Sequence, residues 1–453
     1  MLEAVLVVVT ALFVTAAPVL WLRFLERSNP RWFADGLREA ARVQGIRFSP
    51  RRPYSRSAVG VSGDLSVRVE SRQRRTIEGE NEYWLDLCVS VAGLRIPQRL
   101  EFSAERGTGD DVLTGDTVFD DLVEVRGEAS IVLALLDRGL RQRMSEFVRL
   151  GGRLRGGRLE FCAPATFSQG EIARAVGATL RLARELSSAA GGGICERLAR
   201  NAVSDPHPSV RLWNLLQLQE QFAGTPEAGE ASRADLGDPS PWVRLSAARF
   251  LRDEGHGALE GLTRDRGVPE QAAAEAVALL AARCPPERAG PVLLTVLKTR
   301  TGEARRQAIQ ELGRLRHPPA LGPLIVLLER ADPRTAAAAA SALGSLGDAK
   351  AEPALVKAVE TDERELRLAA ARALGSLGNV RSVEPLLALL QRRLDAESRQ
   401  GIREAIGAIQ SRLAGAEAGQ LSLATSAPGS GWLSLAAPTA GQGDLSLADP
   451  GPE

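Results

Sequence analysis

One apolar position recurs at a nearly constant interval through the second half of the chain. Leu312, Leu343 and Leu374 follow one another at 31 residues, and Ile406 comes 32 residues later. Each of these anchors lies in a helix-like stretch of the form V-R-x-x-A-A-x-A-L-G-x-L, which a second stretch of the form P-x-L-x-x-A-L follows. A single helical hairpin cannot bury its own apolar face, so units of this length must stack on one another. The sequence therefore predicts an α-solenoid over residues 196–413.

The interval between anchors is irregular in the middle of this array. Val277 is the one anchor between Leu251 and Leu312, and it lies 26 residues after the first and 35 residues before the second. We therefore expect a distorted unit around Gly257–Pro286.

Two further motifs mark the repeats. D-P-x-P-x-V-R occurs at Asp205–Arg211 and Asp238–Arg244, and L-G-x-L-G followed by Asp or Asn occurs at Leu343–Asp348 and Leu374–Asn379. These motifs resemble HEAT repeats, in particular the short form called PBS-lyase HEAT-like repeats. The resemblance implies that the V-R-x-x-A-A helices line a concave wall. It also implies a scaffold that binds an unidentified protein partner, and no catalysis.

Arginine recurs seven positions before five of the anchors, while Glu270 and Ala336 hold that position in two other repeats. These arginines are Arg211, Arg244, Arg305, Arg367 and Arg399. Aspartate precedes four of them by four to six residues. One interpretation is a row of guanidinium donors for a carboxylate or phosphate ligand. The other is an Asp–Arg ladder that joins adjacent repeats, with the Asp also capping a helix. Arg249 and Arg372 lie two positions before their anchors, point elsewhere, and are the arginines expected to contact a partner.

Strand patterns precede the array. Apolar and polar residues alternate over 65–70 and 85–91, as in half-buried strands. The other patterned segments are a strand-like run at Leu94–Phe102, a hairpin at Val148–Phe161 with its turn at Gly156 and Gly157, and helices at Ser130–Phe147 and Gln169–Ser187. The sequence predicts a small α+β domain over 58–190.

Four cysteines lie far apart, without a C-x-x-C pair or a histidine at ligand spacing. This spacing argues against a zinc site and a disulfide framework. Cys88 and Cys162 lie in apolar strand-like runs, so we expect buried, inert thiols and a reducing compartment. The nine carboxylates between Glu101 and Glu128 lack the spacing of a calcium loop, and a solvated acidic loop is expected there.

No motif points to a catalytic residue, a cofactor or a metal. The three histidines, His207, His256 and His317, are not followed by Glu, whereas HEAT-like hydroxylases carry His-Glu iron ligands. A HEAT-like lyase or hydroxylase therefore stays an alternative, but the sequence lacks the His-Glu iron ligands of the hydroxylases. A second alternative is nucleic-acid binding through concave arginines. The net charge of +1 disfavours that function, so no nucleic acid is expected.

The N-terminal segment 4–22 holds 19 residues without a charge, about the length that a helix needs to cross a bilayer core. Glu3 is the only charged side chain ahead of this segment, whereas arginines follow it. The positive-inside rule therefore places the rest of the chain in the cytoplasm. In the adjoining segment 23–57, nine arginines against three carboxylates give a charge of +6, which anionic headgroups attract. We expect a single-pass inner-membrane protein with a transmembrane helix at 4–22. A cleaved signal and a buried core helix are the alternatives.

The tail, residues 415–453, is rich in Gly, Pro and Ser, lacks Lys and Arg, and is expected to be disordered. Three G-x-L-S-L-A motifs begin at Gly419, Gly431 and Gly443. Alternating Leu-Ser-Leu suits an extended peptide that adds to a sheet edge or lies in a groove. The candidate partner contacts are therefore Leu421, Leu423, Leu433, Leu435, Leu445 and Leu447. Alternatives are repeat expansion without a partner and docking of the tail on its own solenoid.

Overall fold

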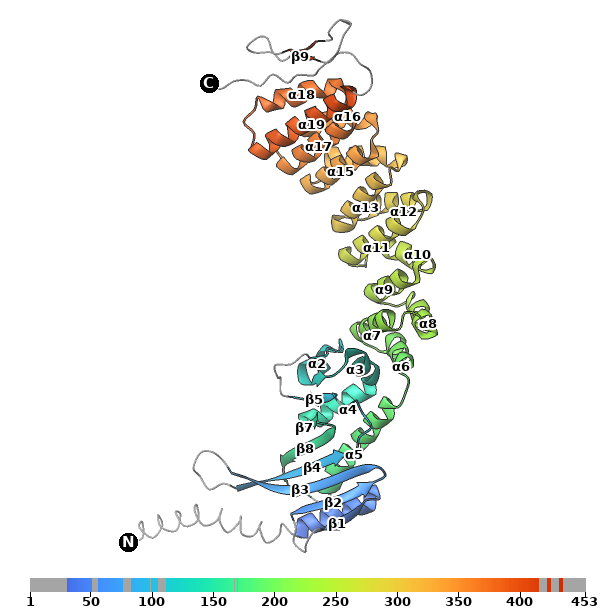
Figure 1. The fold of residues 1–453 in the computed structure, drawn as a ribbon, viewed down its shortest axis with the longest axis vertical. Coiled ribbons are helices and arrows are strands. Elements are labelled where there is room, and N and C mark those ends of the chain that lie inside the picture. The colour runs from blue at the N-terminus through green and yellow to red at the C-terminus, as the bar shows by residue number, and fades with distance from the viewer. Residues whose placement is uncertain are drawn as a thin grey trace, which may run out of the picture. The chain divides into compact units, whose positions relative to one another are not determined.

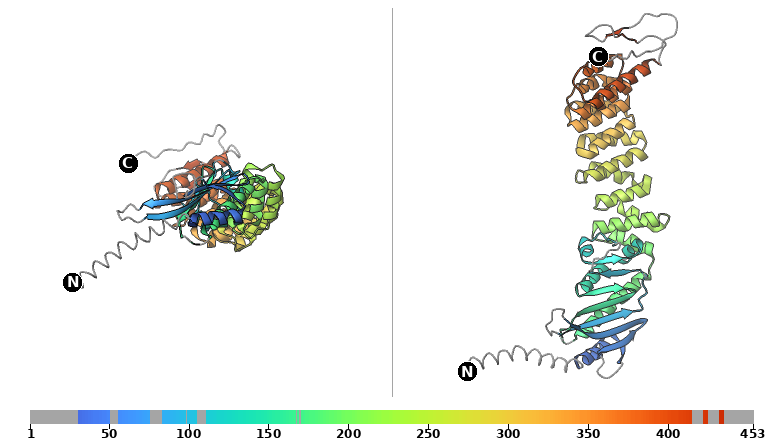
Figure 2. Two further views of the ribbon diagram at one scale, coloured as in Figure 1. Left: turned by 90° about the horizontal axis from the view of Figure 1, so that it is seen from below. Right: turned by 60° about the vertical axis from the view of Figure 1, so that its left-hand side comes forward.

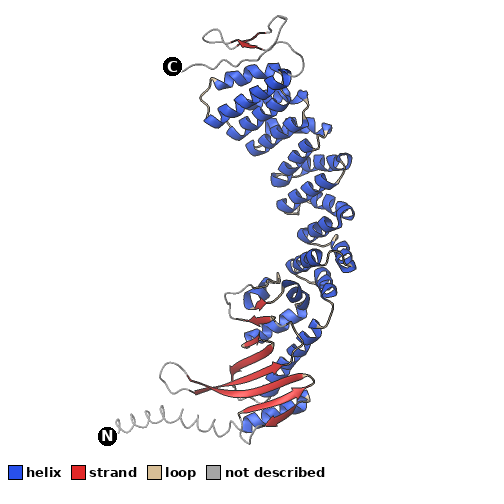
Figure 3. Ribbon diagram, in the orientation of Figure 1, coloured by secondary structure: helices blue, strands red, loops and turns tan. Residues whose placement is uncertain are grey.

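The computed structural model describes residues 31–50, 56–75, 83–97, 99–104, 111–166, 168 and 170–414, together with short strands at 422–424 and 432–434. The chain divides into two compact units, Met1–Asp235 and Leu236–Glu453, which we call the first and second unit. All strands of the described residues lie in the first unit, except for a short pair near the C-terminus (Figures 1 and 3). The second unit is otherwise built from helices.

The first unit contains one eight-stranded antiparallel sheet, in the order β1-β2-β3-β4-β8-β7-β5-β6. Its strands are β1 (Arg47–Pro50), β2 (Ser57–Ser62), β3 (Leu65–Arg75), β4 (Tyr83–Ala92), β5 (Glu101–Ser103), β6 (Glu124–Arg126), β7 (Gly152–Arg155) and β8 (Arg158–Pro164). Its helices cover 31–44, α2 (Thr117–Leu122), α3 (Ala129–Leu135), α4 (Arg138–Arg149), α5 (Glu171–Ala190), α6 (Ile194–Ser204), α7 (Pro208–Gln221) and α8 (Pro226–Asp235).

One face of this sheet makes the core of the first unit. Leu87 and Val89 of β4 pack with Leu180 and Leu186 of α5 in one buried cluster, to which helix 31–44 and α4 also contribute. Alternation along β4 explains this arrangement, because every second side chain points to the helix-covered face. The strands follow one another in one continuous sheet (Figure 2).

The strand expected at Leu94–Phe102 is shorter than its apolar pattern indicates. Only Glu101–Ser103 forms a strand there, β5, which pairs with β6 and β7. Gly93 has a φ of 86°, and Pro97 lacks a backbone donor, so the chain leaves the sheet between β4 and β5. The hairpin at Val148–Phe161 is present as β7 and β8, with Gly156 and Gly157 at positive φ in its turn.

The expectation of two free thiols at Cys88 and Cys162 is wrong. Strands β4 and β8 are neighbours, and their register places these two residues directly opposite one another. The two sulfurs form a disulfide that closes a sequence separation of 74 residues. Cys195 and Cys284 are the free cysteines of the described residues. The sheet is therefore crosslinked at its centre, between two strands that lie far apart in the sequence.

We predict that removal of this disulfide destabilises the first unit. A crosslink over about 74 residues lowers the entropy of the unfolded chain enough to contribute about 4 kcal/mol. The variant Cys88→Ser/Cys162→Ser should unfold at lower denaturant concentration, and a reducing agent should shift the wild type in the same way. Cys195→Ser is the matched control. A wild-type transition that is insensitive to reductant would contradict the prediction.

The second unit consists of paired helices. They are α9 (Pro241–Leu251), α10 (His256–Arg264), α11 (Glu270–Arg283), α12 (Pro286–Thr299), α13 (Gly302–Arg314), α14 (Leu321–Arg330), α15 (Pro333–Leu346), α16 (Glu352–Val359), α17 (Arg364–Leu377), α18 (Val380–Leu390) and α19 (Ala396–Ala414). Short 3₁₀ turns, η1 (Arg252–Gly255), η2 (Pro318–Ala320) and η3 (Ala349–Ala351), connect some of them. Strands β9 (Ser422–Ala424) and β10 (Trp432–Ser434) follow.

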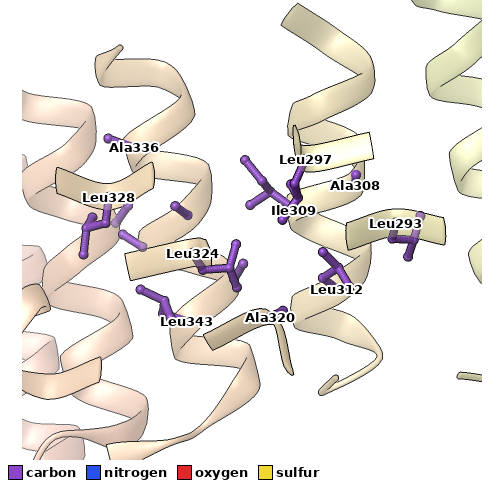
Figure 4. Packing of buried hydrophobic residues seen from close by; sticks show 14 of the residues in the cluster. Leu293, Leu297, Ala308, Ile309, Leu312, Ala320, Leu324, Leu328, Ala336 and Leu343 are labelled. Carbon is purple, nitrogen blue, oxygen red and sulfur yellow. The ribbon is translucent and has the colours of Figure 1, made fainter. Parts of the chain in front are cut away.

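The helices of the second unit form two layers around one continuous apolar core. The odd-numbered helices α11 to α19 stack directly on one another, and the even-numbered helices pack against them. The recurring anchors Leu312 and Leu343 are fully buried between the layers, beside Leu324 and Leu328 of α14 (Figure 4). The apolar repeat predicted from the sequence is therefore the shared core of neighbouring hairpins.

Glycine sets the close approach of the odd-numbered helices. A Cβ atom added to Gly344 of α15 would lie 2.8 Å from the Cα of Ala373 in α17. Gly313 and Gly375 make equivalent contacts with Ala342 and Ala405 of the next odd helix. The Gly of the L-G-x-L motif is thus required because backbone meets backbone there.

We predict opposite effects for the same substitution at two glycines of this register. Gly344→Ala should lower the free energy of unfolding of the second unit by about 1–3 kcal/mol, because the new methyl group overlaps α17. A methyl group added to Gly407 of α19 would meet no atom of another element within 4 Å, so Gly407→Ala should raise it by about 0.5–1 kcal/mol through helix propensity. Urea unfolding followed by circular dichroism measures both. Equal destabilisation by the two variants would refute the packing argument.

The irregular interval around Val277 does not break the helices. Helices α10 and α11 are regular, and α11 contains Val277 as a buried residue. The short interval arises at the α9–α10 connection, where α9 ends at Leu251, η1 follows directly and Arg252 has a φ of 52°. Gly255 packs against the backbone of Ala248, which shortens this unit without distorting its helices.

The prediction of a single-pass inner-membrane protein is corrected. Within the described ranges, no helix combines the length and the apolar composition needed to cross a membrane. The longest, α5, has 20 residues but includes Arg174, Arg181 and Glu185, which are costly in a bilayer core. The segment 4–22, expected as the transmembrane helix, lies outside the described residues, as do residues 23–30 and 51–55 of the arm. The architecture is an α+β region followed by a helical repeat body, without a membrane-spanning element ahead of it in the described fold.

Candidate functional site

A buried arginine joins the sheet-containing part of the first unit to the first repeat helices. Arg141 of α4 is 2% exposed, and its Nε donates to Asp116 Oδ2 at 3.0 Å. Its Nη2 donates to both carboxylate oxygens of Asp205, at 3.1 and 2.9 Å, in the turn between α6 and α7. Nη1 donates to the carbonyl of Leu136 at 2.8 Å. One guanidinium therefore holds α2, α3 and the α6–α7 turn together.

Helix α6 strengthens this junction by capping α3. Asn201 Nδ2 donates to the carbonyl of Leu133 at 2.9 Å, and Arg197 Nε donates to the carbonyl of Ala134 at 3.0 Å. These are C-terminal carbonyls of α3, which lack partners inside their own helix. Asn and Arg side chains on α6 satisfy them, so the first repeat helices and the sheet form one body, as the division of the chain at Asp235 indicates.

Asp116 is the titratable group of this junction. Burial acts to raise its pKa, but hydrogen bonds from Arg141 and from the Phe119 amide, with the charges of His207 and Arg141, outweigh it and hold the pKa below 3.8. His207 Nε2 lies 3.6 Å from Asp116 Oδ2. A carboxylate with a depressed pKa in the folded state stabilises that state above its unfolded pKa, and the contribution is lost as the pH falls through the folded value.

We predict that Arg141→Met lowers the free energy of unfolding of the first unit by about 3–5 kcal/mol at pH 7, because two buried carboxylates lose their cation. The difference from wild type should shrink as the pH falls below 3.8 and through the lowered pKa of Asp116, because the carboxylate that Arg141 stabilises then takes up a proton. Urea titrations at pH 7 and at a pH below 3.8 measure this. Arg143→Met on the same helix is the control, because its pair with Glu185 is half exposed and contributes little.

In the second unit, two of the recurring arginines, Arg244 and Arg367, form rungs of a ladder between repeats. Arg244 Nη1 donates to the carbonyl of Asp238 at 2.9 Å, and its Nη2 lies 4.0 Å from Asp265 Oδ2. Arg367 Nη1 donates to the carbonyl of Thr361 at 3.1 Å, and its Nη2 lies 3.6 Å from Asp395 Oδ2. The Asp–Arg ladder is thus confirmed at these two rungs. These guanidinium groups are engaged within the array, which leaves the ligand-binding interpretation without support there.

The rung at Glu270 has the opposite polarity. Glu270 stands where other repeats have Arg, and Arg300 follows α12 where other repeats have Asp. The two side chains pair at 3.3 Å, and Glu270 Oε2 accepts from the amide of Ala304 at 3.1 Å. Arg300 is buried, and it also donates to four backbone carbonyls around the end of α10, those of Leu262, Thr263, Asp265 and Val268. The departure seen in the sequence is therefore a charge reversal that preserves the pair.

The two arginines expected to contact a partner differ in their surroundings. Arg249 of α9 forms an ion pair with Glu275 of α11. Arg372 of α17 is exposed, and the described part of the chain offers its guanidinium no ion pair. Arg403 of α19 lies three positions before Ile406, next to Glu404, which holds the position equivalent to Arg372, and it is also exposed. Both predicted arginines lie on odd-numbered helices. Their position in the repeat did not indicate that Arg249 forms an ion pair whereas Arg372 does not.

Most of the leucine motifs of the tail lie outside the described residues. Strands β9 and β10 belong to the first and second motif, and they pair antiparallel with Leu423 opposite Leu433 and Ser422 opposite Ser434. Leu421, Leu435, Leu445 and Leu447 fall in the segments that the structure does not describe.

A groove of about 930 Å³ opens in the first unit, between α4 and α5 above β8. Its lining includes the aromatic side chains of Phe147 and Phe161 as well as arginines and glutamates. Some of these charges have partners, as Glu171 accepts from the amide of Thr166 at 2.8 Å and Arg174 donates to the hydroxyl of Ser168 at 2.9 Å. None of the described residues that line it is a histidine or a cysteine. Among the residues that the structure describes, no group of three potential metal ligands is found.

Sequence reasoning did not identify an apolar face on α7. Trp213 and Leu216 are both exposed there, at one turn spacing. The signal was present in the sequence, because α7 has apolar residues on two faces, and a repeat helix needs only one for its core. The sequence also held a signal for the burial of Arg141, because this residue shares a face of α4 with the buried Met144 and Val148.

The family model of HEAT repeats matches residues 323–407. This range runs from α14 to α19, where the 31-residue interval is most regular. No curated protein matches the chain. The match and the two-layered stack of helical hairpins together support HEAT repeats in this part of the second unit.

Proposed function

We propose that the second unit binds a protein partner through the exposed face of its odd-numbered helices. HEAT repeats generally act as scaffolds for protein interactions, and this face is the one that the even-numbered helices leave uncovered. The observation that supports the proposal is the pair Arg372 and Arg403. They lie on the adjacent helices α17 and α19, both are exposed, and the ion pairs of the described residues do not include them.

Exposed serines lie near Arg372 on the odd-numbered helices α15 and α17. Ser341 and Ser345 of α15 and Ser376 of α17 are exposed, and their hydroxyls donate to carbonyls of their own helix. With its hydrogen bonds satisfied inside the helix, such a serine offers a small, level contact to an approaching chain. Two guanidinium groups at the edge of a level surface suit carboxylates of an acidic partner segment.

The tail supports a second contact, which remains a proposal. Strands β9 and β10 have the extended backbone that the leucine motifs were expected to adopt. We propose that Leu421, Leu423, Leu433, Leu435, Leu445 and Leu447 engage a partner as extended segments. Neither contact requires a cofactor, and no observation favours catalysis or nucleic-acid binding.

We predict that Arg372→Glu/Arg403→Glu weakens partner binding about tenfold or more, because both charges at the contact are reversed. Crosslinking and affinity capture of the full chain, with quantification of one recovered partner, measures this. Arg381→Glu is the matched control, since Arg381 is exposed on the even-numbered helix α18. A chain ending at residue 414 tests the tail in the same assay. Equal recovery by wild type and the double variant would rule out this surface.

A further inference from the structure

Helix α7 of the first unit exposes two large apolar side chains on one face. Trp213 is 42% exposed and Leu216 is 37% exposed. Ser209 precedes them and Glu220 follows them at helical spacing, so these four residues form one stripe along the helix. The opposite side of α7 buries Val210, Leu215 and Leu218 in the repeat core. The stripe is therefore additional to what the fold of the repeat needs.

The loop ahead of α2 meets the stripe at Ser209, and two exposed apolar side chains lie in this loop and in the first turn of α2. Gly115 has a φ of 88°, and its Cα lies so close to Ser209 that an added Cβ would be 2.8 Å from the Ser209 carbonyl carbon. Leu113 and Val118, two and three residues from this contact, are 46% and 68% exposed. Large apolar side chains gathered at one place on a surface mark an interaction site more often than scattered ones do.

The junction at Arg141 holds this surface rigid. The turn that begins α7 is fixed by Asp205, whose carboxylate binds Arg141 and accepts from the His207 amide at 3.0 Å. Arg211, one turn before Leu215 in α7, donates from Nη1 to the Asp205 carbonyl at 2.7 Å. A surface that is ordered before binding loses little conformational entropy on association.

We propose that the stripe Ser209, Trp213, Leu216 and Glu220 binds an amphipathic helix of a partner protein, with apolar residues on Trp213 and Leu216 and a Lys or Arg beside Glu220. Tryptophan is the residue most enriched among energetically dominant interface contacts. Glu220 is the charged side chain of the stripe, and it lies at the C-terminal end of α7, where the helix dipole is also negative. A cation on the partner is complementary to both.

The charge of the C-terminal tail excludes it as the segment that binds this stripe. The tail 415–453 contains leucines and a tryptophan, but it has no Lys or Arg and a net charge of −4. It cannot supply the cation opposite Glu220. The inference extends the proposed function, protein binding, to a second surface in the other unit, and it is tested separately from Arg372 and Arg403.

The test uses the full chain and two fluorescein-labelled synthetic helices, one of Leu and Lys in an amphipathic pattern and one with Glu in place of each Lys. We expect the Leu–Lys peptide to bind the wild type at least about tenfold more tightly than the Leu–Glu peptide, measured by fluorescence anisotropy. Trp213→Ala/Leu216→Ala should weaken binding of the Leu–Lys peptide about 30-fold. Glu220→Lys should reverse the preference between the two peptides.

Two controls separate this surface from others. Val326→Ala removes an equally exposed apolar side chain on α14 and should leave binding unchanged. Arg372→Glu/Arg403→Glu should also leave it unchanged, so failure at α7 is distinguishable from failure of the proposed function. No binding of the Leu–Lys peptide, equal binding of both peptides, or wild-type affinity in the Trp213 and Leu216 double variant would each overturn the proposal.

Discussion

The buried guanidinium of Arg141 connects two parts of the molecule that differ in every other respect. A helical repeat array needs a neighbour at its first hairpin, because an uncovered terminal hairpin exposes its apolar face. Here the sheet-containing region covers the first hairpin, and Arg141 forms ion pairs with Asp116 and Asp205 across the contact. Removal of Arg141 leaves two carboxylates without their cation away from water. The first repeat helices are therefore stable only in the presence of the α+β fold.

Local sequence pattern was sufficient for features that depend on neighbouring residues. The 31-residue interval predicted stacked hairpins because the same leucine meets the same core in every unit. The Gly-Gly turn predicted the β7–β8 hairpin for the same reason. The disulfide was missed, because Cys88 and Cys162 become neighbours only when β4 and β8 pair, and nothing in the flanking sequence indicates that pairing. The apolar run at Leu94–Phe102 was overextended because hydrophobicity outweighed the backbone limits of Gly93 and Pro97.

In the candidate site, too, local pattern located some residues, whereas their partners depend on tertiary structure. Register within the repeat located Arg249 and Arg372 on the odd-numbered helices, yet only tertiary structure shows that Glu275 pairs with the first. The exposed stripe on α7 could have been suspected from a helix with two apolar faces. Its flanking surface could not, because Gly115 and Ser209 are separated by more than ninety residues of sequence and meet only through the Arg141 junction.

The reversed rung at Glu270 and Arg300 gives the array a fixed order. Repeats with nearly identical cores can pair out of sequence during folding, since one hairpin offers much the same apolar face as the next. A slip by one unit would bring the buried Arg300 opposite an arginine, or the half-exposed Glu270 opposite an aspartate. Each such pairing of like charges disfavours the slipped arrangement, most strongly at the buried Arg300. One inverted pair in the middle of the stack thus distinguishes the native order of hairpins from its shifted alternatives.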